Sequence, residues 1–146
     1  LAEQMYLQNE KRAARAQYTR VVRLDPDNVL ALNNLAWLLR KSDPKRALVL
    51  IRRAAKLVPG DPMVLDSRAV IEYLNGKHRA AAVVIQQALE AAPGNPSIRY
   101  HQAMIQNALG QADAAREQLE DILADGQPAF PEQGEARALL ESLGAG

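Results

Sequence analysis

Few residues of this 146-residue chain stand in arrangements that could do chemistry. The two histidines, His78 and His101, are far apart, and neither belongs to an HExxH or His-x3-His pattern that would hold a metal ion. Cysteine is absent, which excludes disulfides, thiolate metal sites and a cysteine nucleophile. No serine stands in a G-x-S-x-G turn, and no paired carboxylates are set up for acid–base work. We therefore expect no catalytic residues, no metal site and no cofactor, and we interpret the chain as a non-enzyme.

Two Gly-containing loops remain as candidates, PGDP at 59–62 and PGNP at 93–96. Each precedes an expected helix, as a phosphate-binding loop does, but neither is followed by Lys and Ser or Thr. The two loops lie 34 residues apart, and a looser version, LDPDN, stands at 24–28. The recurrence indicates joints between structural repeats rather than a ligand site.

The composition indicates one folded domain with an unevenly charged surface. Hydrophobic residues make up 48% of the sequence, enough to build a core. Residues 1–60 hold 12 Lys and Arg against five Asp and Glu, whereas residues 61–146 hold six against 12. No apolar run approaches the roughly 20 residues of a membrane span. Because the sequence begins with Leu1, we expect it to be part of a longer protein.

Four columns of residues recur at a period of 33 or 34, which is typical of helix–turn–helix repeats. The first column holds a small residue, the second holds a large apolar residue four positions later, and the third comes three positions after that. The columns are Ala14, Ala47, Ala81 and Ala115; then Tyr18, Ile51, Ile85 and Leu119; then Val21, Ala54, Ala88 and Ile122; and, between repeats, Pro26, Pro59 and Pro93.

Each period divides into two helices. Apolar residues follow the i, i+3, i+4, i+7 spacing of a helix face, and Gly76 and Gly110 stand where a left-handed residue can end the first helix of a pair. Asp61 and Asn95 are expected helix caps, each followed by a proline in the first turn. After the helix stop at 125–126, Phe130 and Pro131 predict a last helix over about 131–143 that covers the open end of the stack.

These columns resemble the tetratricopeptide repeat, whose pattern is W-x2-L-G-x2-Y, then A-x3-F-x2-A, then P. The second repeat, for example, offers Leu32, Leu35, Ala36 and Leu39, followed by Ala47, Ile51, Ala54 and Pro59. The resemblance implies an all-α fold, a right-handed α-solenoid of antiparallel helix pairs with a C-terminal capping helix. It implies a single domain, 1–146, with a partial repeat at 1–28, repeats at 29–61, 62–95 and 96–126, and the cap at about 131–143.

The resemblance also implies that the first helix of each repeat lines a concave face that holds a peptide or a partner protein. The family's groove positions fall on Asn33, Asn34, Trp37, Arg40, Asp66, Val70, Tyr73, Tyr100, His101, Met104 and Asn107, with Ser67 beside them. Aromatic, Arg and Asn side chains together are typical of binding hot spots. The alternative interpretation places Trp37, Tyr73 and Tyr100 in the core between repeats.

Arg68 and Gln102 stand where the family usually has Leu. A buried, unpaired Arg would be very costly, so we expect Arg68 to reach solvent along its stem or to pair with Asp66 or Glu72. The competing hypothesis is that these polar residues mark a contact surface.

A second resemblance is to the C-terminal repeats of bacterial lipoproteins of exopolysaccharide and exosortase (PEP-CTERM) systems. It is carried by the runs NNLAWLL, VLDSRAVIEYLNGKHRAA and GQPAFPEQGEARALLESL. It implies an interaction scaffold in a bacterial envelope assembly, in the periplasm or at the outer membrane, with the cytoplasm as the alternative.

Three further interpretations stay open. The basic N-terminal half could bind a polyanion, although nucleic acid is not the partner that we expect. The protein could be an accessory module of a larger enzyme. The open N-terminal end could form a homodimer. A carboxylate clamp of the kind that grips the C-termini of chaperones is not expected, because no Lys stands at the groove positions.

Overall fold

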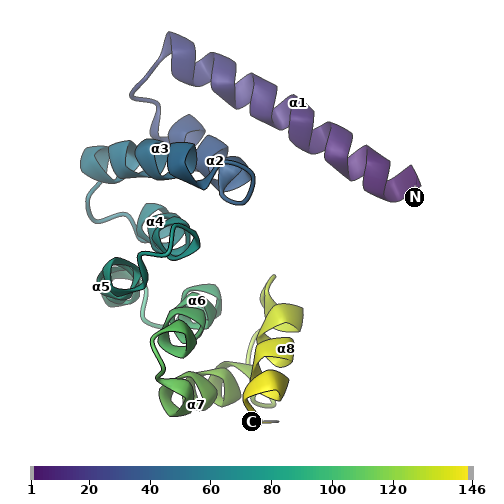
Figure 1. Ribbon diagram of the computed structural model, residues 1–146, viewed down its shortest axis with the longest axis vertical. Coiled ribbons are helices and arrows are strands. Elements are labelled where there is room, and N and C mark those ends of the chain that lie inside the picture. The colour runs from purple at the N-terminus through teal and green to yellow at the C-terminus, as the bar shows by residue number, and fades with distance from the viewer. Residues whose placement is uncertain (1, 145–146) are drawn as a thin grey trace.

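The computed structural model describes residues 2–144, and over this range the protein forms eight helices and no strand. They are α1 (Ala2–Leu24), α2 (Val29–Leu39), α3 (Pro44–Leu57), α4 (Pro62–Leu74), α5 (His78–Ala91), α6 (Pro96–Ala108), α7 (Ala112–Leu123) and α8 (Gln133–Gly144). They follow one another in an arc (Figure 1), with α2, α4 and α6 on the inner side and α3, α5 and α7 on the outer side. The expected all-α repeat solenoid is confirmed.

Side-chain caps begin the helices on the inner side. Asn28 accepts a hydrogen bond from the Ala31 backbone N–H at 2.9 Å, and Asn95 accepts one from the Ile98 N–H at 3.1 Å. Asp61 caps α4 by accepting from the N–H groups of Met63 and Val64. Each cap satisfies a backbone donor that the first helical turn leaves free. The PGDP and PGNP stretches are therefore joints that end one helix and start the next.

Gly76 and Gly110 end α4 and α6 in the left-handed conformation, with φ of 77° and 80°. After each of them, a backbone N–H reaches back five residues, from Lys77 to the Glu72 carbonyl and from Gln111 to the Gln106 carbonyl. This pattern closes a helix end and needs a residue that tolerates positive φ. The sharp turn that follows brings the second helix of the pair back against the first.

The core consists of three successive clusters, each shared by neighbouring helices. Ile51 belongs to the first, among α2, α3 and α4; Ile85 to the second, among α4, α5 and α6; and Leu119 to the third, among α6, α7 and α8. The small Ala47, Ala81 and Ala115 are fully buried where the helices approach one another. Because each repeat completes the core of the next, the stack is held together by contacts between neighbours.

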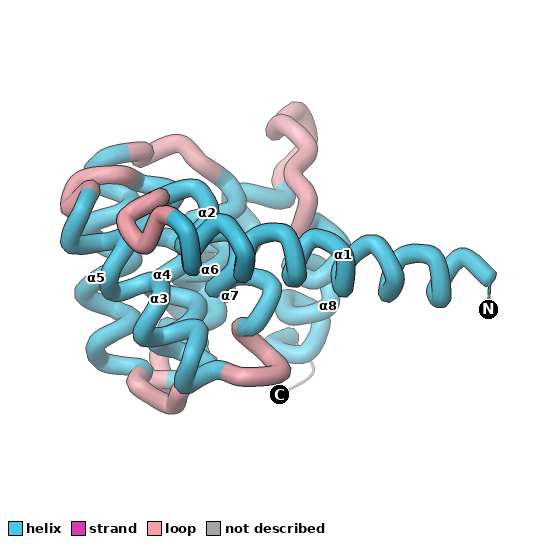
Figure 2. Tube along the Cα trace, turned by 90° about the horizontal axis from the view of Figure 1, so that it is seen from above, coloured by secondary structure: helices cyan, strands magenta, loops and turns pink. Residues whose placement is uncertain are grey.

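The first helix differs from the rest. No residue of α1 is buried, and the helix extends away from the body of the molecule (Figure 2). Only Tyr18 and Val22 pack against the first core cluster, whereas Met5 and Tyr6 are 65% and 63% exposed. The half-repeat expected at 1–28 is thus a long helix with an uncovered face.

The C-terminal helix starts later than the sequence predicts. Pro131 was expected as its first helical position, but residues 131 and 132 form a turn and α8 begins at Gln133. Phe130 is buried in the third cluster, and the carboxylate of Glu132 accepts a hydrogen bond from Ser97. These two anchors hold the segment against α6, and the helix starts directly after them.

Candidate functional site

A groove of about 330 Å³ lies along the inner side of the arc, where α2, α4 and α6 meet the segment before α8. It combines amide, carboxylate, hydroxyl, imidazole and apolar side chains. The residues that line it are Asn33, Asn34, Trp37, Met63, Asp66, Ser67, Asn95, Ser97, Ile98, His101 and Glu132.

Trp37 is fixed at one end of this groove. The Arg40 guanidinium lies over its indole ring, 4.1 Å from the centroid, and donates to the Trp37 carbonyl at 2.8 Å. The ring of His101 approaches the indole with a centroid separation of 6.3 Å. Burial lowers the pKa of Arg40, which still carries its charge because an arginine pKa lies far above neutrality. The contacts hold the indole in place before any partner arrives.

His101 and Asp66 join two helices across the groove floor. The His101 Nδ1 lies 2.7 Å from Asp66 Oδ1, and the two side chains are 5% and 17% exposed. Since a nitrogen at this distance from a carboxylate donates its proton, the bond fixes the orientation of the imidazole. His101 is therefore a structural element of the groove floor that links α6 to α4.

Asparagine side chains supply the remaining hydrogen-bonding capacity. Asn34 donates to the Tyr18 hydroxyl at 3.2 Å, which connects the groove to α1. The Asn33 Oδ1 atom is buried and accepts no hydrogen bond within residues 2–144. Leaving a buried acceptor without a donor costs free energy, so this amide is a destabilised point of the groove wall.

The described residues contain neither a cluster of metal ligands nor a helix that could span a membrane. Within residues 2–144, no three His, Asp or Glu side chains gather so that they could hold a metal ion. None of the helices in that range combines the length and the apolar character that a membrane crossing requires.

Two sequence profiles of the tetratricopeptide repeat (TPR) match the sequence, one over residues 6–62 and the other over residues 73–143. The protein carries tetratricopeptide repeats. Over 59 residues, or 39% of its length, it is 44% identical to the TPR repeat-containing protein PA4667 of Pseudomonas aeruginosa. The match spans only 10% of that relative's length.

Solved TPR structures share the fold at low sequence identity. The crystal structure of MamA matches with a TM-score of 0.70 and 16% identity, over 99% of this protein and 93% of the other. The Yersinia enterocolitica type III secretion chaperone SycD, solved in complex with a peptide of the translocator YopD, matches with a TM-score of 0.66 and 18% identity. That match covers 82% of this protein and 94% of SycD.

Only some of the residues predicted from the TPR register line the groove. Asn33, Asn34, Trp37, Asp66 and His101 line it. Arg40 does not line the groove, but its guanidinium lies over the Trp37 indole ring and supports it.

The other predicted positions lie elsewhere. Val70 is 4% exposed and lies within the stack, and Tyr73 packs against the second core cluster. Tyr100 and Met104 belong to the third cluster or pack against it, together with side chains of α8. Asn107 is exposed at the end of α6, outside the groove. The capping helix therefore occupies the lower part of the face that the TPR register would leave open.

Five lining residues were absent from the predicted set: Met63, Asn95, Ser97, Ile98 and Glu132. Met63 stands three residues before Asp66, and Ile98 stands three before His101, so both lie one helical turn toward the N-terminus on the same face. This spacing of three residues could have predicted Met63 and Ile98 from the sequence. No sequence signal could have predicted Glu132, because only the folded cap brings it to Ser97.

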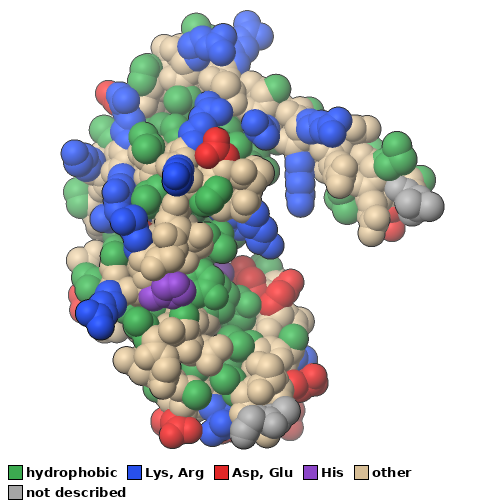
Figure 3. Space-filling view, viewed as in Figure 1, with side chains coloured by type: hydrophobic (Ala, Val, Ile, Leu, Met, Phe, Trp, Pro, Cys, Tyr) green, Lys and Arg blue, Asp and Glu red, His purple; other side chains and the backbone are tan. Residues whose placement is uncertain are grey.

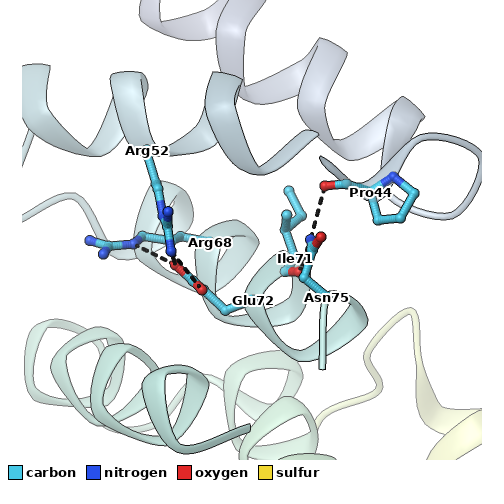
Figure 4. Close-up of polar contacts among 6 residues, drawn as sticks. All are labelled: Pro44, Arg52, Arg68, Ile71, Glu72 and Asn75. Carbon is cyan, nitrogen blue, oxygen red and sulfur yellow. Dashed lines mark hydrogen bonds and ion pairs between the residues drawn. The ribbon is translucent and has the colours of Figure 1, made fainter. Parts of the chain in front are cut away.

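Arg68 and Gln102, which stand where the family usually has Leu, lie against other polar side chains in the fold. Glu72, 1% exposed, accepts hydrogen bonds from Arg52 at 3.0 and 3.2 Å, and the Arg68 Nε lies 3.6 Å from the same carboxylate (Figure 4). Gln102 bonds to Gln86 and Gln118. Arg68 thus lies near the carboxylate of Glu72, as one expectation had it, and the hypothesis of a contact surface stays a prediction.

Proposed function

We propose that this protein is a non-catalytic protein-interaction scaffold whose groove binds an extended peptide segment of a partner protein. The observation that carries the proposal is the lining of the groove, which combines side-chain amides with the apolar side chains of Trp37, Met63 and Ile98. TPR proteins are generally scaffolds of this kind, and the structural relative SycD was solved with a bound peptide.

The chemistry of the lining suits a peptide backbone. An asparagine amide offers a donor and an acceptor, as a peptide group does, so Asn33, Asn34 and Asn95 can pair with the main chain of a ligand whatever its sequence. The apolar side chains then select for residues that fill the space beside Trp37.

A display library of short random peptides tests the proposal. Trp37 is the only tryptophan in the sequence, so its fluorescence reports binding at this groove directly. We expect wild type to enrich peptides that also change the Trp37 emission. We expect Trp37→Ala, scored by peptide recovery from the library, to lose that enrichment while keeping its helical circular dichroism. Val83→Ala is the matched control, because Val83 is 62% exposed on α5 and lies outside the groove. Equal enrichment by wild type and Trp37→Ala would contradict the proposal.

An arginine surface on α1 favours a second candidate function, the binding of a polyanion. Arg12, Arg15, Arg20 and Arg23 line one exposed face of the helix, and none of them forms an ion pair within the described residues. Figure 3 shows Lys and Arg gathered over the end of the molecule near α1. Such binding to double-stranded DNA would weaken steeply with salt and with Arg12→Ala or Arg23→Ala. Salt-independent or absent binding would dismiss this candidate.

The biological context stays a prediction from sequence resemblance. The envelope location and the link to exopolysaccharide or protein sorting are expectations of that kind. The homodimer is an expectation from the open N-terminal end of the repeat stack. Fractionating the cells that produce the protein would test the location directly.

A further inference from the structure

We propose that the groove selects a basic peptide segment, in which a Lys or Arg side chain reaches Asp66 and Glu132 while a neighbouring apolar residue packs on Trp37. This inference rests on the proposed peptide-binding function and adds the chemical class of the partner.

The charges of the groove are of one sign. Its lining holds the carboxylates of Asp66 and Glu132 and no Lys or Arg. A cationic side chain would therefore meet complementary charge, whereas an acidic side chain or the terminal carboxylate of a peptide would meet repulsion. A groove that binds a carboxylate would need Lys or Arg side chains in its lining.

Both carboxylates keep room for a further donor. Asp66 Oδ1 bonds to His101 Nδ1 at 2.7 Å, and Glu132 Oε2 accepts from the Ser97 hydroxyl at 2.6 Å. Over residues 2–144, the second oxygens, Asp66 Oδ2 and Glu132 Oε1, receive no hydrogen bond. An ammonium or guanidinium can bind these oxygens without displacing the bonds that hold the carboxylates in place.

The positive charge nearest to Trp37 does not neutralise this lining. Arg40 is committed to the Trp37 carbonyl and to the face of the indole, and it is not part of the groove surface. Acidic residues lie near Tyr100, at the Glu132 end of the groove. Burial raises the pKa of the Tyr100 hydroxyl, and the carboxylates of Glu135 and Glu132 raise it further. The field at the Glu132 end of the groove is thus negative.

The apolar part of the lining lies beside the carboxylates. Met63 belongs to the same helix as Asp66, and Ile98 belongs to the same helix as His101. Met63 is 74% exposed although its side chain is large and apolar. A ligand that places an apolar residue next to a basic one would cover Met63 and pair Asp66 at the same time.

Charge-neutral variants of the carboxylates test the inference in the random peptide library. Asp66→Asn and Glu132→Gln keep an oxygen that can accept from His101 or Ser97 but remove the charge. Glu117→Gln and Asp125→Asn are matched controls, since both residues are exposed and lie outside the groove. Wild type and the controls should enrich peptides with Lys or Arg next to an apolar residue. For such a peptide, Asp66→Asn should raise the Kd about tenfold, and the double variant should lose the preference for basic residues.

The outcomes separate this inference from the function on which it rests. Enrichment that depends on Trp37 but shows no preference for basic peptides would overturn the inference and leave the peptide-binding function standing. The absence of any Trp37-dependent enrichment would overturn both. Sedimentation supplies the remaining outcome: self-association that Asp66→Asn abolishes would mean that the basic α1 of a second copy fills the groove, and it would overturn the proposed partner.

Discussion

Replacing Arg52 with methionine should leave the buried carboxylate of Glu72, between the second and third repeats, without its main counterion. Glu72 is 1% exposed, and its carboxylate receives two hydrogen bonds from the Arg52 guanidinium. Methionine keeps most of the length of the arginine stem but has no donor. Once Arg52 is gone, only the Arg68 Nε remains near the carboxylate, at 3.6 Å and without a hydrogen bond.

The size of the effect follows from the burial of Glu72. Removing one partner of a buried ion pair costs about 3–5 kcal/mol, because the remaining charge has lost both water and its counterion. Arg68 compensates in part, so we expect Arg52→Met to destabilise the protein by about 3 kcal/mol, at the lower end of that range.

The neighbouring Arg53 supplies the control. It also forms an ion pair, with Asp27, but these side chains are 52% and 65% exposed. An exposed pair contributes only about 0.2–1 kcal/mol, so Arg53→Met should change stability by less than about 1 kcal/mol. Urea denaturation followed by circular dichroism measures both variants under the same conditions, and the difference between their midpoints isolates the effect of burial.

A second variant tests the cause. Glu72 occupies the column that holds the buried Leu39 in the preceding repeat, so the double variant Arg52→Met, Glu72→Leu removes the stranded charge and fills the site with apolar surface. It should recover most of the lost stability. Equal midpoints for Arg52→Met and Arg53→Met, or no recovery in the double variant, would refute the reasoning.

Three further predictions concern the packing, the turns and the titration of the fold. Ala81 is fully buried beside Ala69 and Ile85, so Ala81→Leu should overpack the helix pair and cost about 1–3 kcal/mol, seen as a lower melting temperature. A Cβ at Gly110 would meet no atom within 4 Å, but its φ is 80°, so Gly110→Ala should cost about 1 kcal/mol of backbone strain in urea denaturation. Because the pKa of Tyr100 is raised, the folded state holds the phenol proton more tightly than the unfolded state, and stability should fall as the pH rises above about 10. That alkaline loss should be smaller in Tyr100→Phe, measured by urea midpoints across the pH range, and an identical loss in both proteins would contradict the assignment.

The repeated local signals predicted the helix pairs well. Asp61, Asn95 and the prolines after them define helix starts through contacts within one turn, and Gly76 and Gly110 define helix ends through their own φ angles. Such information is local, so it can be read from neighbouring residues. The helix pairs followed from these boundaries together with the period, and the resemblance to the tetratricopeptide repeat implied the all-α solenoid.

The last helix was expected from about residue 131 and begins at Gln133, because distant contacts act there beside the local signals. Proline at position 131 suits a first helical turn, and local chemistry alone favours a start there. In the fold, the Phe130 side chain enters the third cluster and Glu132 reaches Ser97, 35 residues away. Contacts over that distance override the local preference.

The candidate site was predictable only where repeats behave alike. Asn33, Trp37 and Asp66 follow from the TPR register and do line the groove. One period after Trp37, Val70 is buried in the stack instead, and in the last repeat Tyr100 and Met104 pack in the third cluster with residues of α8. A periodic rule cannot anticipate a cap, because the cap is the part of the sequence that breaks the period.

The central claim is that a peptide lies along α2, α4 and α6, and chemical-shift mapping tests it most directly. A nitrogen-labelled sample of residues 1–146 would be titrated with a peptide enriched by the library. The account predicts that the largest shifts fall on Asn33, Asn34, Trp37, Asp66 and His101. Shifts concentrated on the outer helices α3, α5 and α7 would contradict it.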